Sequence, residues 1–218
     1  MMMSVDGRID CPMVAQISGE EYYTALDSFG TSSKLSGRVT AALECPAVSE
    51  VISGNAGSGI GIESVNKAVE SNEYTIVVDT HGRLQMNCGD ADGHPLLVVM
   101  GEQVSEEHLA MLRRNNVSWI VTGRERINLR RAVEIMAEQF GVERLIIVGG
   151  GNINGGFLEA GLIDEVSVMM APGIDGRHGM TAVFDGCTWT ADAPYKLRLK
   201  SVEQMAGTET VWVRYTCE

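Results

Sequence analysis

The sequence predicts an α/β fold: one domain over residues 1–218, with a mixed, mostly parallel sheet flanked by helices and a C-terminal antiparallel hairpin. Short β-branched runs alternate with segments of helical periodicity, and these runs are apolar on both faces, as buried parallel strands are. The tail instead alternates polar and apolar residues, which is typical of antiparallel strands. Because no repeat or Pro/Ser-rich linker interrupts the chain, we expect a single domain.

Five segments of the body of the chain are predicted to be strands. The chain opens with apolar residues that run into a turn at Asp6-Gly7, which indicates a short first strand. Four later runs are short and rich in β-branched residues. They cover residues 75–79, 95–100, 117–122 and 144–148.

Capping signals predict two of the helices. Ser18-x-x-Glu21 matches a capping box, which predicts a helix that continues to about Ser28. Residues 105–114 open with Ser-Glu-Glu and end in Arg-Arg, so their charges complement the helix dipole at both ends.

Periodicity and glycine stops predict the remaining elements. Apolar positions recur with helical spacing from Leu129 to Phe140, and Gly141 ends that helix. A further helix closes at residues 157–160, before a glycine. Residues 196–216 alternate around Ala206-Gly207, which predicts a hairpin at a sheet edge.

Composition narrows the classes of partner. With 17 basic and 29 acidic residues the net charge is −12, the wrong sign for a nucleic-acid binder or a protein that docks on anionic membranes. No apolar run is long enough to span a bilayer, and the four histidines share no metal-ligand spacing. The cysteines are scattered and odd in number: Cys11, Cys45, Cys88, Cys187 and Cys217. We therefore expect free thiols in a reducing cytoplasm, with no disulfide and no zinc site.

A glycine-rich segment, residues 149–156, follows a predicted strand and precedes a predicted helix. In open α/β sheets ligands bind at the carboxyl ends of strands, where glycines permit close approach and N–H groups at a helix start can hold a phosphate. A tight crossover that needs small residues for packing would leave the same pattern, and both interpretations stay open. The segment is neither a Rossmann fingerprint, because Asn154 stands where Gly or Ala is required, nor a P-loop. A second glycine cluster, residues 54–61, is expected to be a loop.

Arginine recurs at three strand ends. Gly37-Arg38-Val39-Thr40 opens a helix, and residues 79–83 (Asp-Thr-His-Gly-Arg) end another strand. Arg124 and Arg126 follow a third. Each alone is compatible with a solvated arginine, but in an acidic chain together they indicate one anionic ligand.

The first strand ends in Asp6-Gly7-Arg8. One interpretation is a turn in which Asp6 bonds the local backbone and Gly7 takes a positive φ. The other places Asp6 and Arg8 above the sheet, where they would orient a substrate. The sequence holds no Gly-x-Ser-x-Gly elbow and no recognisable cysteine nucleophile, so chemistry supplied by a bound cofactor suits this chain.

Together these segments resemble the reductase domain of riboflavin biosynthesis, the C-terminal domain of the bifunctional deaminase–reductase, in the dihydrofolate-reductase-like family. The chain start is similar to the family's S-x-D-G-[KR]-I, and residues 37–40 are similar to its G-R-x-T segment. The longest match runs from residue 148 to residue 172 and resembles G-G-x-x-[LI]-N-x-x-[FL]-[LI]-x-x-x-L-[VI]-D-E. The resemblance covers nearly the whole chain.

The resemblance implies roles for these positions. It implies NADPH as cofactor and a homodimer as the assembly. The NADPH pyrophosphate would be held by Gly149, Gly150, Gly151, Asn152 and Ile153, and flanked by Gly37, Arg38, Val39 and Thr40. The adenosine ribose and its 2′-phosphate would lie near Asp79, Thr80 and Arg83. The substrate would face Ser4, Asp6, Arg8 and Ser18, with Asp6 as the catalytic candidate, acting as a polar orienter or proton relay.

Two positions depart from the pattern of riboflavin-pathway reductases. Gly149 stands where these enzymes often carry a Glu, and residues 42–46 replace an Asp-Asn-Pro segment. Missing polar anchors predict altered substrate discrimination.

Three functions therefore stay open. The first is hydride transfer from NADPH to a C=N or carbonyl carbon of a small heterocyclic or sugar-linked substrate, such as 5-amino-6-(5-phosphoribosylamino)uracil or its diamino-pyrimidinone analogue. The others are a non-catalytic NADPH-binding module and an interaction protein in which the glycines serve packing alone.

Overall fold

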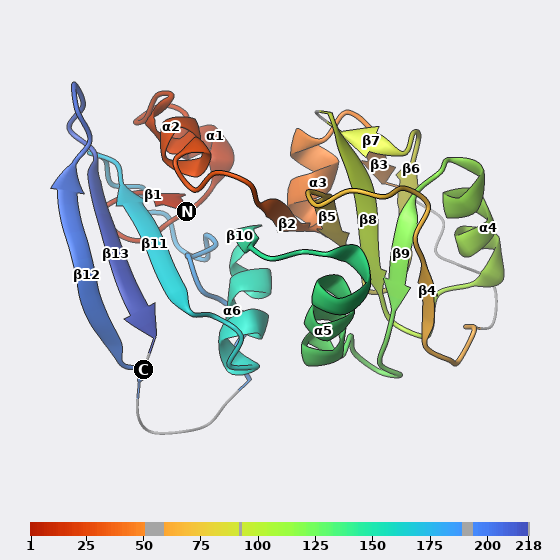
Figure 1. Cartoon of the computed structure of the whole chain (residues 1–218). Helices are drawn as coiled ribbons and strands as arrows, with labels where there is room; N and C mark the ends of the chain where they lie inside the picture. The colour runs from red at the N-terminus through yellow and green to blue at the C-terminus, as the bar shows by residue number, and fades with distance from the viewer. Residues whose placement is uncertain (51–58, 92, 189–193, 218) are drawn as a thin grey trace. The chain divides into compact units, whose positions relative to one another are not determined.

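The computed structural model describes residues 1–50, 59–91, 93–188 and 194–217 (Figure 1). The chain forms two compact units. Unit 1 comprises Met1–Gly30 and Gly149–Glu218, and unit 2 comprises Thr31–Val148. Residues 54–58 of the second glycine cluster lie outside the described residues.

Unit 2 is built on the largest sheet, whose strand order is β10-β2-β5-β8-β9-β4. Neighbouring strands from β2 to β9 are parallel, whereas β4 pairs antiparallel with β9. The strands are β2 (Ser33–Gly37), β4 (Ser64–Asn66), β5 (Thr75–Val78), β8 (His94–Met100), β9 (Ser118–Val121) and β10 (Leu145–Gly149). Short antiparallel pairs complete the unit: β7 (Asp90–Ala91) on β8, and β3 (Val48–Glu50) with β6 (Leu84–Met86). The four β-branched runs predicted to be strands are confirmed as β5, β8, β9 and β10, to within about one residue.

Three helices belong to unit 2: α3 (Arg38–Glu44), α4 (Glu106–Arg114) and α5 (Leu129–Phe140). Ser105 caps α4 by accepting the N–H of His108, and Gly141 ends α5 with a φ of 68°. The predictions for both helices are confirmed. Strand β8 is buried on both faces, as its apolar run predicted, because Leu96 and Leu97 point to opposite faces and both are 0% exposed.

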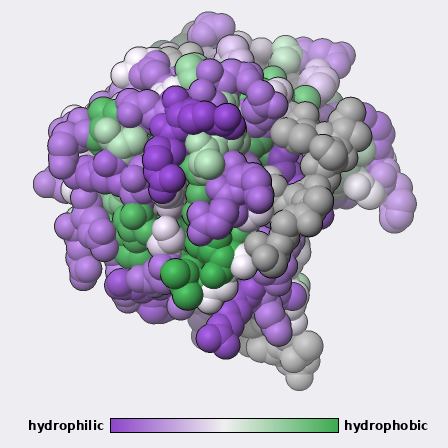
Figure 2. Space-filling view, turned by 90° about the vertical axis from the view of Figure 1, so that its right-hand side faces the viewer, coloured by the Kyte–Doolittle hydropathy of each residue, from purple (hydrophilic) through white to green (hydrophobic). Residues whose placement is uncertain are grey.

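The outer surface of unit 2 on the side of α4 and β4 is mainly hydrophilic, with a hydrophobic area among the polar side chains (Figure 2). No helix in the described part of the chain is long and apolar enough to cross a membrane.

Unit 1 contains a four-stranded sheet in the order β1-β11-β13-β12. Its strands are β1 (Met2–Met3), β11 (Glu165–Met170), β12 (Leu197–Gln204) and β13 (Val211–Cys217), and its helices are α1 (Cys11–Val14), α2 (Glu21–Asp27) and α6 (Gly151–Glu159). The predicted C-terminal hairpin is confirmed as β12 and β13. It belongs to this second sheet, and of its two strands β12 lies at the edge whereas β13 lies inside. Buried Met169 and Trp212 on this sheet pack with Ala25 of α2.

The predicted capping box is wrong. Helix α2 begins at Glu21, but its N-cap is Glu20, with no side-chain cap. Ser18 lies too far upstream and donates its hydroxyl to the Val14 carbonyl at 2.8 Å. The Glu21 carboxylate is buried and accepts the Gly19 N–H, and it also accepts the hydroxyl of Thr210 at 2.8 Å. A distant hydroxyl has therefore replaced the local partner that the motif requires.

Candidate active site

The carboxyl ends of the parallel strands meet at one edge of the sheet of unit 2. Gly37 at the end of β2 pairs in register with Val78 at the end of β5. Beyond β5, the carbonyl of Thr80 accepts the N–H of Gly101, which follows β8, at 3.0 Å. A Cβ at Gly101 would lie 3.2 Å from that carbonyl oxygen, so the two loops approach closely at a residue without a side chain. This edge therefore brings together two of the segments that the sequence singled out.

The segment from Gly37 to Thr40 forms the start of α3, as predicted. Gly37 is the N-cap and offers no side-chain cap to the first turn. Arg38 and Thr40 are partly buried, whereas Val39 is exposed. Backbone donors and a guanidinium thus lie together at the end of β2.

Asp79 is buried beneath the next turn, with 1% of its surface exposed. Its Oδ2 accepts the N–H of Leu84 at 2.7 Å, while its backbone carbonyl accepts the N–H of Gly82 at 3.1 Å. The carboxylate therefore closes the turn from residue 79 to residue 84 from inside. Thr80 is partly buried, and Arg83 is exposed with no ion-pair partner among the described residues.

The glycine-rich segment lies in unit 1 at the start of α6. Gly149 has a φ of 113°, and a Cβ there would lie 2.9 Å from the Met1 methyl group. A Cβ at Gly151 would lie 2.3 Å from the Ala182 carbonyl oxygen, and one at Gly155 would overlap another backbone oxygen. Packing thus explains why positions 151 and 155 are occupied by glycine.

The helix start also leaves donors available. Gly150 is the N-cap of α6 and supplies no side chain, and the N–H groups of Gly151 and Asn152 donate to no described residue. Asn152 is exposed and Ile153 is partly buried. Both interpretations of the glycines, packing and phosphate binding, are therefore compatible with this geometry.

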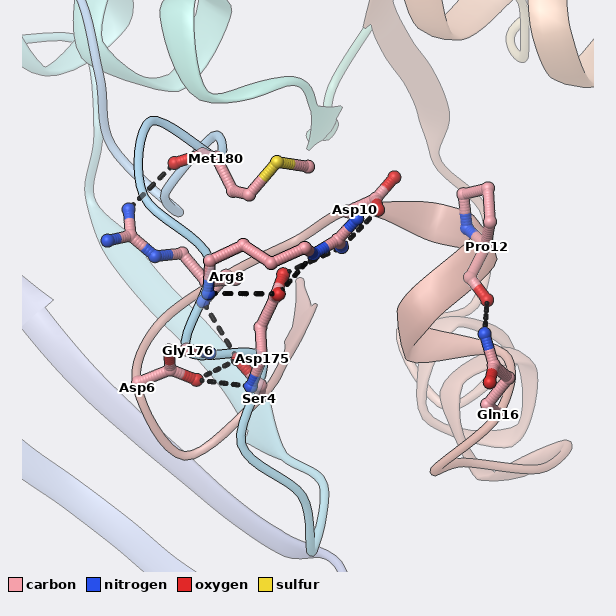
Figure 3. Close-up of polar contacts among 10 residues, drawn as sticks. Ser4, Asp6, Arg8, Asp10, Pro12, Gln16, Asp175, Gly176 and Met180 are labelled. Atoms are coloured by element: carbon pink, nitrogen blue, oxygen red, sulfur yellow. Dashed lines mark hydrogen bonds and ion pairs between the residues drawn. The ribbon is translucent and has the colours of Figure 1, made fainter.

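Near the start of unit 1, the buried Ser4 contacts the exposed Asp6 (Figure 3). The Ser4 hydroxyl, 0% exposed, donates to Asp6 Oδ1 at 2.6 Å. Asp6 also accepts the N–H groups of Asp175 and Gly176, both at 3.0 Å. The Ser4 hydroxyl, followed by these two N–H groups, holds the pKa of Asp6 well below its usual range. Asp6 is thus ionised at neutral pH, and Gly7 takes a φ of 80°, as the turn interpretation predicted.

Arg8 follows Asp6 and Gly7 in the chain. Its Nη1 donates to the carbonyl of Met180 at 2.7 Å, but its Nε is buried and has no partner in the described structure. Arg8 makes no ion pair with any described carboxylate. It is therefore a partly buried cation with unused donor capacity, which suits an anionic ligand.

A second arginine in this region is already paired. Arg177 donates to Asp10 Oδ2 at 2.6 Å and to Asp175 Oδ2 at 2.9 Å. The Arg177 hydrogen bond keeps the pKa of Asp175 below its ordinary value. Sequence analysis missed Asp10, Asp175 and Arg177; the polar, glycine-containing loop after residue 172 was the available signal.

Ser18 does not join the polar cluster of Ser4, Asp6 and Arg8. Its hydroxyl is used within its own turn. The neighbouring Ile17 packs against Gly173, where a Cβ would lie 2.7 Å from the Ile17 side chain.

Asn154, which the family pattern includes, is buried in α6. Its Nδ2 donates to the carbonyl of Val183 at 2.6 Å. This bond fixes the segment after residue 180 to the helix that carries the glycines.

Cys45, Cys88, Cys187 and Cys217 form no disulfide with one another, and the Cys11 side chain lies outside the described part. The described residues contain no cluster of His, Cys, Asp and Glu that could hold a metal ion.

An open α/β sheet with glycine turns and arginines at the carboxyl ends of its strands defines a protein of the ligand-binding α/β class. The family model for the RibD C-terminal domain matches residues 1–211, and this chain belongs to that family. The predicted family and the mixed α/β fold are thereby confirmed.

Individual relatives agree with this assignment. A 2,5-diamino-6-ribosylamino-4(3H)-pyrimidinone 5′-phosphate reductase of Methanothermobacter thermautotrophicus is 31% identical over 158 residues, 71% of each chain. A pyrimidine reductase-like protein of Corynebacterium diphtheriae has a similar structure, with a TM-score of 0.73, 13% identity and coverage of 100% of this chain and 89% of that one. RibD of Acinetobacter baumannii gives a TM-score of 0.68 at 16% identity, and the match covers all of this chain but only 56% of RibD. The present chain thus spans about half the length of that protein.

Proposed function

We propose that this protein is an NADPH-dependent reductase that transfers a hydride to a ribosylamino-pyrimidine 5′-phosphate. The observation that carries the proposal is the polar edge of unit 2, where the starts of α3 and of the turn after β5 lie on adjacent parallel strands. The membership in a family whose curated relative is a pyrimidinone phosphate reductase supports the substrate class.

The residues of this edge suit a dinucleotide phosphate. Arg83 is exposed and unpaired among the described residues, so its guanidinium is available to a 2′-phosphate. Arg38 and Thr40 lie at the end of the neighbouring strand and would flank the pyrophosphate, and Asp79 would act by holding the turn that carries Thr80. In unit 1, the N–H groups of Gly151 and Asn152 would bind the pyrophosphate.

The substrate half is proposed in unit 1. Arg8 would bind an anionic group of the substrate, because its buried Nε has no partner among the described residues. Ser4 and Asp6 would hold the turn at residues 175–176 in place beside it. Ser18 would also face the substrate, and only the resemblance to riboflavin-pathway reductases supports that role.

The cofactor supplies the hydride when it is bound. The protein then has to position the acceptor carbon and keep the surrounding charges fixed. Because the pKa of Asp6 is strongly lowered, this carboxylate carries no proton at neutral pH, which favours the role of polar orienter over that of proton relay. The proton that neutralises the reduced substrate would come from solvent.

We also propose a homodimer that forms through the outer sheet of unit 1. Leu199 and Val202 of β12 are 57% and 56% exposed, and they lie opposite Tyr215 and Val213 of β13. Directly opposed residues share one face of a sheet, so these side chains form an apolar surface that a second copy would cover. Sedimentation of the wild type and of Leu199→Lys tests this assembly; a wild-type monomer would overturn it. We place its site of action in a reducing cytoplasm on the scattered, odd-numbered cysteines of the sequence.

Titration with NADPH and NADH at two salt concentrations, followed by energy transfer from tryptophan to nicotinamide, tests the cofactor. We expect binding that favours NADPH and weakens with salt. A panel of ribosylamino-pyrimidine phosphates, pterins and simple carbonyls then tests catalysis. NADPH binding without turnover would support the non-catalytic module instead, and binding of neither nucleotide would leave the glycines as packing residues.

A further inference from the structure

Two buried polar atoms of unit 2 have no hydrogen-bond partner among the described residues. They are Oδ1 of Asp79 and Nε2 of His108. Asp79 is 1% exposed and His108 is 7% exposed, so bulk water does not solvate either group freely. A buried polar atom without a partner is costly, and native structures satisfy nearly all of them with protein or ordered water.

The two side chains belong to elements that pack together. His108 lies in the first turn of α4, and α4 packs against β6 and β9. Strand β6 begins at Leu84, whose N–H donates to the other oxygen of Asp79. Leu84 and Leu109, the residue after His108, share one buried apolar cluster. The helix that carries His108 therefore packs against the strand that follows the turn closed by Asp79.

The electrostatics agree with this proximity. Burial lowers the pKa of His108, and the Asp79 charge is close enough to raise it in part. The imidazole is thus neutral at pH 7 and carries its proton on only one nitrogen.

We infer that His108 is a positioning residue for the turn from residue 79 to residue 84: its Nε2–H donates, through one buried water, to Asp79 Oδ1. We place a water between them because neither atom has a hydrogen-bond partner among the described residues, and a bridging water would satisfy both. This arrangement gives each oxygen of Asp79 a donor, Leu84 N–H on one side and the bridged imidazole on the other.

The consequence concerns the cofactor and rests on the proposed function. The turn that Asp79 closes carries Thr80 and Arg83, so His108 would fix the phosphate-binding edge without touching the nucleotide. It would act on affinity for NADPH rather than on the chemical step.

Two measurements on the nucleotide-free protein test the inference. The ¹⁵N shifts of the wild-type imidazole report its tautomer, and we expect the proton on Nε2. A proton on Nδ1 would overturn the proposal. Hydrogen exchange of the Leu84 amide reports the turn directly, since that N–H is held by Asp79.

Two variants separate the effect of losing the hydrogen-bond donor of His108 from the effect of changing the shape of its side chain. His108→Leu removes the donor and should speed Leu84 exchange about tenfold, the effect of losing one buried hydrogen bond. His108→Gln keeps an N–H donor at the distance of Nε2 and should restore slow exchange. Equal exchange in Leu and Gln variants would overturn the role, and if the Leu variant does not fold, the wild-type tautomer decides.

NADPH titration of the same variants separates this inference from the proposed function. We expect His108→Leu to weaken NADPH binding and His108→Gln to preserve it. If no variant, including wild type, binds a nucleotide while Leu84 exchange responds as expected, the proposed function fails and the positioning role of His108 stands.

Discussion

Asp6 and Gly176, far apart in the sequence, are joined by a hydrogen bond of 3.0 Å from the Gly176 N–H to Asp6 Oδ2. The other oxygen accepts the N–H of Asp175 and the hydroxyl of Ser4. One carboxylate thus organises a loop that is contributed by the other end of unit 1. Asp6 therefore stabilises a contact between distant segments of the chain as well as its own turn.

Asp6→Asn should lower turnover on the order of tenfold and leave NADPH affinity unchanged, because an amide offers one acceptor oxygen where two are used. Steady-state kinetics and nucleotide titration measure the two effects. Asp27→Asn, at an exposed aspartate of α2, is the matched control. A normal rate in Asp6→Asn would remove this residue from the mechanism.

Arg83→Ala should weaken NADPH binding about fivefold and leave NADH binding nearly unchanged, since an exposed ion pair contributes little and is screened by salt. Titrations at low and high salt measure the change, and the salt dependence should become shallower. Arg114→Ala removes an equally exposed arginine at the far end of α4 and should have no effect. An unchanged preference for NADPH would place the 2′-phosphate elsewhere.

Gly149→Glu restores the residue that riboflavin-pathway reductases often carry, but it should destabilise this protein by roughly 1–3 kcal/mol. The reason is the φ of 113° together with the Met1 methyl group 2.9 Å from the new Cβ. Urea unfolding measures the loss. Gly149→Ala isolates the backbone strain from the carboxylate, and full stability in both variants would contradict the strain at this position.

Stability should fall as the pH drops below about 6.5, in part because of His108. Its native pKa lies below the ordinary value of 6.5, mainly through burial, so the unfolded chain binds more protons in the window between the two values. The free energy of unfolding therefore rises with pH across that window. Besides Asp79, the charged neighbours on its own helix are Glu106 and Glu107.

Urea unfolding at about pH 7.5 and about pH 5.5 measures this slope. His108→Gln should make it shallower. An unaltered slope in His108→Gln would show that His108 titrates normally.

Sequence patterns predicted those features that depend on neighbours along the chain. The β8 run of apolar residues signals a strand buried on both faces, and Ser105 with Glu106 signals the start of α4. The capping-box prediction failed because helix α2 begins at Glu21, whose carboxylate also bonds the distant Thr210. A local motif cannot reveal a partner that folding brings in from elsewhere.

The candidate site divides in the same way. The sequence by itself determined the family, the positions of β5, β8, β9 and β10 and of α4 and α5, and the strand ends that carry glycine and arginine, because periodicity and short motifs encode them locally. Only the tertiary structure decided which of these groups already have hydrogen-bond partners. Asp79 is buried under its turn and Asp6 is bonded to the distant residues 175 and 176, whereas Arg8 has an unused donor. Burial and hydrogen bonding between distant segments fix these states, and such contacts have no spacing in the sequence that could predict them.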